Sequence, residues 1–237
     1  VLFRSAQMLH SSNFAIVDNE GGGDCLFAAV RDGLDSVDAG VSVEEMRGML
    51  AKEVTDSVFE GYKEQYDMYS TAARAAAKEM AQLARESTRI KSELKRTRDL
   101  QEKKELIERA SVAAAQYAEH KAEKTMMGEL AQEFSFMRGV KNIAAFRKKI
   151  QTCSFWADTW AISTLERTLN VKLVLLSQEA YESGDVANVL HCRQLNDTIL
   201  EEKGSFTPDW YIMLSYDGTH YQIVTFKGIG AFKFKQL

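Results

Sequence analysis

A long stretch without helix-breaking residues constrains the fold of this chain more than any other feature. The 237 residues include one proline, Pro208, and no glycine lies between Gly61 and Gly128. The middle of this stretch is rich in Lys, Arg, Glu, Gln and Ala, which are good helix formers. Its apolar residues are too sparse for a helix deep in a core. We therefore expect an inserted helical lobe over about residues 59–127, with a reversal near 97–101. The lobe is either a solvated structural pair or a surface that holds a protein partner.

A glycine-rich loop in front of a cysteine is the second feature. Three glycines at 21–23 precede Asp24 and Cys25, and residues 26–30 are all apolar. This change predicts a buried helix that begins at Cys25 and ends near Gly33 or Leu34. A helix N-terminus favours a negative sulfur, and its free N–H groups can hold an oxyanion. Cys25 is therefore a candidate nucleophile, although most free cysteines are simply small buried hydrophobes.

The remaining segments predict an α+β fold. Ser42 and Glu45 have the spacing of a capping box at the start of a helix. A second helix is expected after Asp158 as N-cap, with an apolar face that includes Trp156 as a buried anchor, and Asn170 ends it. Strands are expected at 13–17, 171–176, 185–192, 210–214 and 220–226, with an Asp-Gly turn at 217–218 before the last. We expect these strands to form a mostly antiparallel central sheet flanked by helices.

Composition and charge exclude several function classes. Apolar residues make up 45% and the formal net charge is −4, as in an ordinary globular protein with no electrostatic preference for nucleic acid or an anionic membrane. The three cysteines lack CxxC spacing, so we expect neither a metal site, nor another cofactor, nor a disulfide framework. Their use suits a reducing compartment, the cytoplasm. No apolar run reaches the roughly 18 residues of a membrane span.

Three motifs in order resemble the OTU (ovarian tumour) family of papain-like cysteine proteases. They are Gly-Asp-Cys-Leu-Phe at 23–27, Trp-Ala-Asp at 156–158 before a Leu-Asn-Val strand, and Gly-Thr-His-Tyr at 218–221. The resemblance spans about residues 13–228 apart from the insertion, and the long insertion is similar to that of the bacterial-effector branch. It implies a papain-like fold in a single catalytic domain, 1–237, with the helical insertion at about 59–127. It also implies a deubiquitinase that acts on ubiquitin or polyubiquitin chains, with secretion by a bacterium into a host cytosol as one possible location.

The resemblance also implies roles for individual residues. Cys25 would be the nucleophile and His220 the general base that activates it. Asp18 ranks first for the group that orients His220, because the effector branch places its acid upstream of the cysteine. Gln222 ranks second and Asp217 third. The other histidines, His10, His120 and His191, lie outside the motifs.

Asp24 is expected to shape the loop, because a carboxylate that faced the sulfur would raise the pKa of the thiol. The backbone N–H groups of Asp24 and Cys25 are the expected oxyanion donors. Two alternatives remain open: a catalytically weak OTU-like ubiquitin-binding module, and a protease for another ubiquitin-like modifier.

Overall fold

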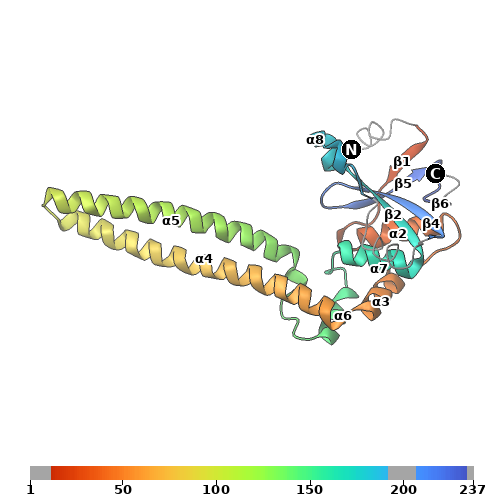
Figure 1. Cartoon of the computed structure of the whole chain (residues 1–237), viewed down its shortest axis with the longest axis horizontal. Helices are drawn as coiled ribbons and strands as arrows, with labels where there is room; N and C mark the ends of the chain where they lie inside the picture. The colour runs from red at the N-terminus through yellow and green to blue at the C-terminus, as the bar shows by residue number, and fades with distance from the viewer. Residues whose placement is uncertain (1–11, 192–206, 234–237) are drawn as a thin grey trace. The chain divides into compact units, whose positions relative to one another are not determined.

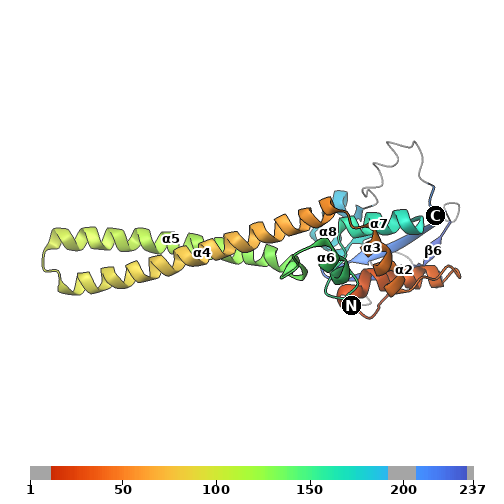
Figure 2. The same cartoon turned by 90° about the horizontal axis from the view of Figure 1, so that it is seen from below.

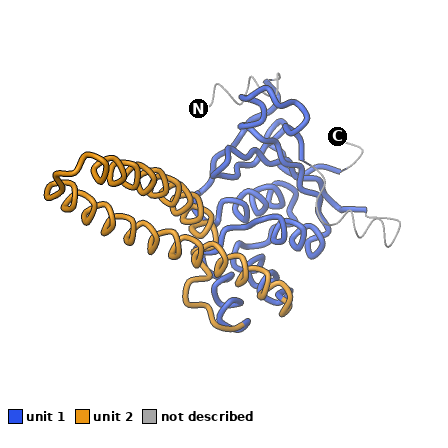
Figure 3. The backbone as a smooth tube through the Cα atoms, turned by 60° about the vertical axis from the view of Figure 1, so that its left-hand side comes forward, with its two compact units in different colours: residues 1–54, 143–237 blue, residues 55–142 orange. Residues whose placement is uncertain are grey.

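The chain divides into two compact units in a computed structural model that describes residues 12–191 and 207–233. One unit comprises residues 1–54 and 143–237, and the other comprises residues 55–142 (Figure 3). The helical segment expected at about 59–127 lies inside the second unit. That the whole chain acts as a single catalytic domain stays a prediction.

The second unit is a helical hairpin. Helix α4 (Asp56–Arg96) and helix α5 (Leu100–Glu133) pack side by side along their length (Figures 1 and 2), and a 3-10 turn, η2 (Ser135–Met137), follows. Thr55 and Asp99 accept backbone N–H bonds at the two helix starts. The reversal falls at residues 97–99, which confirms the predicted position. Only a few side chains of these two helices are buried, namely Tyr62, Ala76, Ile90, Leu106 and Ala113.

A sheet forms the centre of the first unit. Its strands are β1 (Phe14–Val17), β2 (Val171–Ser177), β3 (Leu190–His191), β4 (Trp210–Tyr216), β5 (Tyr221–Phe226) and β6 (Ala231–Phe232). Their order is β1-β5-β4-β2-β3, and β6 pairs with β4 on the edge that β5 also uses. Strands β2 and β4 are parallel, and the other pairs are antiparallel. The sheet is therefore mixed, with antiparallel pairs in the majority as predicted.

The helices of this unit are α2 (Cys25–Asp35), α3 (Val43–Glu53), α6 (Ile143–Ile150), α7 (Thr159–Leu169) and the short α8 (Gln178–Ser183). Helices α2, α3 and α7 lie on one side of the sheet (Figures 1 and 2). Helix α2 packs on β5, and α3 packs on α2, α6 and α7. The fully buried side chains between these layers include Phe27, Met46, Leu50, Phe146, Ile150, Phe155, Leu165, Leu173 and Ile212. Within the described ranges, no helix combines the length and the apolarity that crossing a membrane would require.

Helix ends follow the local sequence where a cap defines them. Ser42 and Glu45 form the predicted capping box. Asp158 accepts a hydrogen bond from Ala161 N–H at 3.1 Å as the N-cap of α7. Asn170 ends that helix in the left-handed conformation. These three predictions are confirmed.

Helix α2 ends at Asp35, one residue beyond the predicted end at Gly33 or Leu34. Gly33 instead lets the helix approach the sheet. A Cβ atom at this position would lie 3.1 Å from side-chain carbons of both Ile212 and Ile223. The glycine therefore serves packing in the helix interior, and it does not terminate the helix.

Two further predictions are wrong. Trp156 is not a buried anchor, because its exposed fraction is 50% and it precedes the first residue of α7. The neighbouring Phe155 is buried instead and contacts Phe146 and Trp160 edge-on. Within 185–192, a 3-10 turn, η3 (Val186–Asn188), replaces most of the expected strand, and only β3 remains; Cys192 lies outside the described residues.

Candidate active site

Three segments that are distant in sequence meet beside the start of α2. Strand β1 pairs with β5 in a register that sets Val17 against Ile223. In this register the residue after β1, Asp18, falls beside Gln222, and the two side chains are hydrogen-bonded. His220 lies in the turn just before β5, and Cys25 is the first residue of α2, which packs on β5. The sheet pairing and the helix packing thus bring the three predicted catalytic residues into one region.

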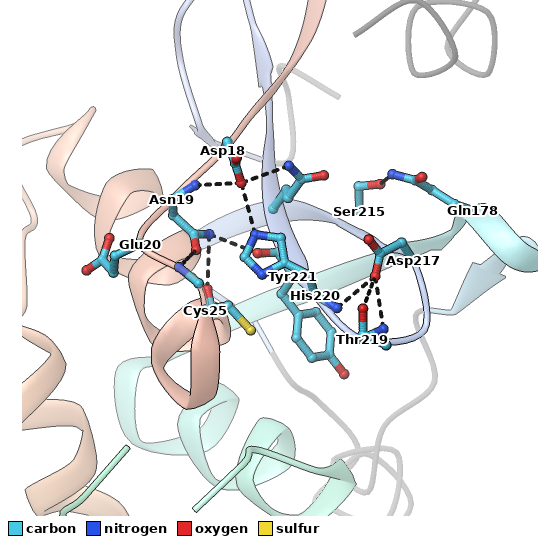
Figure 4. Close-up of polar contacts among 12 residues, drawn as sticks. Asp18, Asn19, Glu20, Cys25, Gln178, Ser215, Asp217, Thr219, His220 and Tyr221 are labelled. Atoms are coloured by element: carbon cyan, nitrogen blue, oxygen red, sulfur yellow. Dashed lines mark hydrogen bonds and ion pairs between the residues drawn. The ribbon is translucent and has the colours of Figure 1, made fainter. Parts of the chain in front are cut away.

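The Asp18 carboxylate holds the ring of His220. His220 Nε2 lies 2.9 Å from Asp18 Oδ1, and Gln222 Nε2 donates to the same oxygen at 3.0 Å (Figure 4). These hydrogen bonds, followed by one from the backbone N–H of Asn19, lower the pKa of Asp18 below its usual value. Gln222, ranked second as the orienting group, therefore contacts the carboxylate.

Asp217, ranked third, shapes the turn before β5. Its Oδ1 accepts hydrogen bonds from the backbone N–H groups of Thr219 and His220, at 2.9 and 2.8 Å. Burial alone would raise the pKa of Asp217, but these hydrogen bonds and the nearby His220 ring together outweigh it, so the pKa lies below its usual value. Asp217 thus fixes where the backbone of His220 enters the strand, and Asp18 contacts the ring.

Cys25 is buried, with an exposed fraction of 3%. Figure 4 shows its sulfur directed from the start of α2 toward His220 and Tyr221. Burial raises the pKa of the Cys25 thiol, while hydrogen bonds from the backbone of Tyr221, Leu26 and Cys25 itself act in the opposite direction. The backbone donors at the start of α2 thus favour a negative sulfur, as expected, and desolvation outweighs them.

The glycine loop forms a tight turn directly before Cys25. Gly21 and Gly22 both have positive φ, and a Cβ atom at Gly21 would lie 3.8 Å from Cε1 of His220. Residues 22–24 form a 3-10 turn, η1, in which Cys25 N–H donates to the carbonyl of Gly22. The Cys25 N–H, one of the two predicted oxyanion donors, thus makes a hydrogen bond within the loop, and its role toward an oxyanion stays a prediction.

Asn19 is a residue of the site that the sequence did not reveal. Its Nδ2 donates to the carbonyl of Tyr221 at 2.8 Å and to that of Cys25 at 3.2 Å. Its Oδ1 accepts from the backbone N–H of Gly21 at 3.1 Å. One amide thus joins the loop, the start of α2 and the start of β5. Asn is a common turn residue, so nothing in the sequence around position 19 signals this role.

The other candidate residues lie elsewhere. Asp24 pairs with Arg47, which agrees with its expected role in shaping the loop. His120 lies in the helical hairpin beside Glu123, His191 is exposed in β3, and His10 is outside the described residues. Among the residues that the structure describes, no group of three or more His, Cys, Asp or Glu side chains has an arrangement that could hold a metal ion.

Comparisons with known proteins leave the family open. No family model matches the chain, and no curated protein does. Among solved structures, the chain is similar to an OTU domain in complex with ubiquitin, with 13% identity and a TM-score of 0.42 over 94% of this chain and 76% of that one. Values this low do not establish a shared fold. The chemistry of the site is therefore derived from its own contacts.

Proposed function

We propose that this chain is a thiol-dependent deubiquitinase that hydrolyses the isopeptide bond at the C-terminus of ubiquitin. The observation that carries the proposal is the 2.9 Å contact between His220 and Asp18 beside the thiol of Cys25. A carboxylate, an imidazole and a thiol in this order are the groups that acyl transfer through cysteine requires. The substrate class comes from the resemblance of the three sequence motifs to the OTU family.

The bond to Asp18 assigns separate roles to the two ring nitrogens of His220. With Nε2–H donated to the carboxylate, Nδ1 is the nitrogen that accepts the proton of the Cys25 thiol. The sulfur then attacks the carbonyl carbon of the terminal glycine, and the negative charge of Asp18 stabilises the imidazolium. The imidazolium donates this proton to the departing lysine amine. Loss of the amine leaves a thioester on Cys25. Water, deprotonated by the same ring, hydrolyses the thioester and restores the thiol.

Burial of the sulfur determines when the proton moves. Burial raises the pKa of the Cys25 thiol and so favours its neutral form in the free protein. In the proposed mechanism, the thiol therefore loses its proton as it attacks the substrate. The backbone N–H groups around the sulfur stabilise the negative charge that develops on it during this step.

Cleavage assays on the full chain test this function. Wild type should release the fluorophore from ubiquitin bearing a C-terminal aminocoumarin and should cleave di-ubiquitin, whereas Cys25→Ala should do neither. Cys153→Ser is the matched control, because Cys153 is a second free cysteine with an exposed side chain. Cleavage that persists in Cys25→Ala, or that disappears in Cys153→Ser, contradicts the proposal.

The buried thiol supports a second candidate, a catalytically weak module that binds ubiquitin without turnover. A ubiquitin probe with a C-terminal electrophile separates the two candidates, because covalent capture requires an activated sulfur. Capture at Cys25 supports the enzyme. Binding of ubiquitin without capture supports the module. A panel of probes built on other ubiquitin-like modifiers tests whether ubiquitin is the preferred substrate.

A further inference from the structure

A buried arginine anchors the loop in front of Cys25. Arg47 lies within α3, and its exposed fraction is 3%. Its Nε donates to Asp24 Oδ1 at 2.7 Å, and Nη2 lies 2.6 Å from the same oxygen. Nη2 also donates to the carbonyl of Gly23 at 2.8 Å. A single side chain thus holds both the backbone and the carboxylate of the two residues that precede the sulfur.

The same guanidinium reaches two further segments. Nη1 donates to the carbonyl of Ile150 at 2.7 Å, and both Nη1 and Nη2 donate to that of Phe155 at 3.3 Å. The guanidinium carbon lies 4.2 Å from the ring centroid of Phe27, in the first turn of α2. A buried charge is tolerated only when it is paired and hydrogen-bonded. Here the bonds to Asp24 and Gly23 fix the loop before α2, and the bonds to Ile150 and Phe155 tie the guanidinium to neighbouring backbone.

The pairing also has an electrostatic consequence. Asp24 directly precedes Cys25, and a carboxylate free to approach the sulfur would disfavour the thiolate. The bonds to Arg47 draw this carboxylate toward α3 and compensate its charge. Arg47 can therefore influence the reactivity of a sulfur that it does not contact.

We propose that Arg47 is a positioning residue for the reaction at Cys25. Its side chain fixes the backbone of Gly23 and Asp24 and compensates the charge of the Asp24 carboxylate. This inference rests on the proposed function, because it assumes that Cys25, which follows the loop, is the nucleophile. A purely structural arginine would lower stability and leave the folded protein's kinetics unchanged. A positioning residue changes kcat and the reactivity of Cys25, while KM stays nearly constant.

Arg47→Lys tests this role, because lysine keeps the charge and cannot reach all four acceptors. In the folded variant, we expect kcat for ubiquitin aminocoumarin to fall about 10- to 100-fold, as for a misplaced catalytic group, with KM nearly unchanged. Alkylation of Cys25 by iodoacetamide, followed on its own peptide by mass spectrometry, should slow by up to about tenfold at neutral pH, which corresponds to one pKa unit.

Arg147→Lys is the matched control. Arg147 also binds a backbone carbonyl, that of Val54 at 2.8 Å, and it does so away from the glycine loop. It should keep wild-type kcat and alkylation. A folded Arg47→Lys protein with both quantities at wild-type values overturns the inference. If wild type does not hydrolyse ubiquitin, the proposed function fails, and the alkylation rates still decide the role of Arg47.

Variants of Asp24 carry the test if Arg47→Lys does not fold. Asp24 is partly exposed, so its replacement is less demanding than that of Arg47. Asp24→Asn keeps an oxygen for Nε but leaves the buried guanidinium without its carboxylate, so its kcat should lie between those of wild type and Asp24→Ala. Asp24→Ala removes the anchor, and kcat should fall several-fold. Equal kcat in Asp24→Asn and Asp24→Ala overturns the inference.

Discussion

His220 Nε2 lies 2.9 Å from Asp18 Oδ1, although 202 residues separate the two in the chain. The antiparallel pairing of β1 with β5 produces this contact. Its register sets Val17 against Ile223, so that Asp18 leaves the strand beside the turn that carries His220. The carboxylate is largely exposed, with a side-chain exposure of 76%, and its position depends on hydrogen bonds.

Asp18→Asn should lower kcat. An amide in place of the carboxylate keeps the shape of the contact and removes the charge that stabilises the imidazolium. We expect a loss of about 10- to 100-fold, less than the roughly 100- to 10,000-fold contribution of general acid–base catalysis, because His220 itself remains. Steady-state hydrolysis of ubiquitin aminocoumarin measures it. Glu20→Gln is the control, because Glu20 is a neighbouring acid that pairs with Arg31 instead. Equal kcat for wild type and Asp18→Asn would remove Asp18 from the mechanism.

Gln222→Ala should have a smaller effect than Asp18→Asn. The glutamine donates one of the hydrogen bonds that hold the carboxylate, and those from His220 and from the backbone of Asn19 remain. We expect kcat to fall by no more than about fivefold. This factor corresponds to about 1 kcal/mol, the net contribution of one hydrogen bond. The same assay decides the order of the two variants. A larger loss in Gln222→Ala would mean that the amide acts on His220 itself.

Alkylation of Cys25 should depend on pH as expected for a buried thiol. Burial raises its pKa, so the reactive thiolate fraction at neutral pH is smaller than for an ordinary cysteine with a pKa of about 8.5. The alkylation rate of the free wild-type protein should therefore continue to rise above a pH of about 8.5, the ordinary pKa of a cysteine. The rate is measured on the Cys25 peptide by mass spectrometry at a series of pH values. A plateau already at pH values near neutral would instead indicate a preformed thiolate–imidazolium pair.

Gly23→Ala should destabilise the protein. An added Cβ would lie 1.8 Å from the carbonyl oxygen of Cys153, and this oxygen belongs to the backbone and cannot rotate away. We expect a loss of about 1–3 kcal/mol in the free energy of unfolding, the usual cost of overpacking. Denaturant titration measures it.

Gly48→Ala is the control for this change. Gly48 lies inside α3 with nothing within 4 Å of its added Cβ, so alanine should stabilise the helix by up to about 1 kcal/mol. If both variants lose the same stability, the close approach of Gly23 to Cys153 does not explain the effect.

The sequence by itself determined the elements that local interactions define. Ser42 with Glu45, Asp158 and Asn170 set helix ends through hydrogen bonds and dihedral angles of neighbouring residues. The segment between Gly61 and Gly128, which contains neither proline nor glycine, lies in two long helices. Helix propensity is likewise a local property of each residue.

The tertiary structure decided which side chains meet. Trp156 and Phe155 are adjacent and aromatic, and only the packing against α6 and α7 shows that Phe155 is the buried one. A glycine such as Gly33 often marks the end of a helix, but here it lies in the helix interior against Ile212 and Ile223 of the sheet. Asn19 and Arg47 carry no signal in the sequence, since their acceptors come from segments up to 202 residues away. Contacts of this kind depend on strand register and helix packing, which local sequence patterns do not encode.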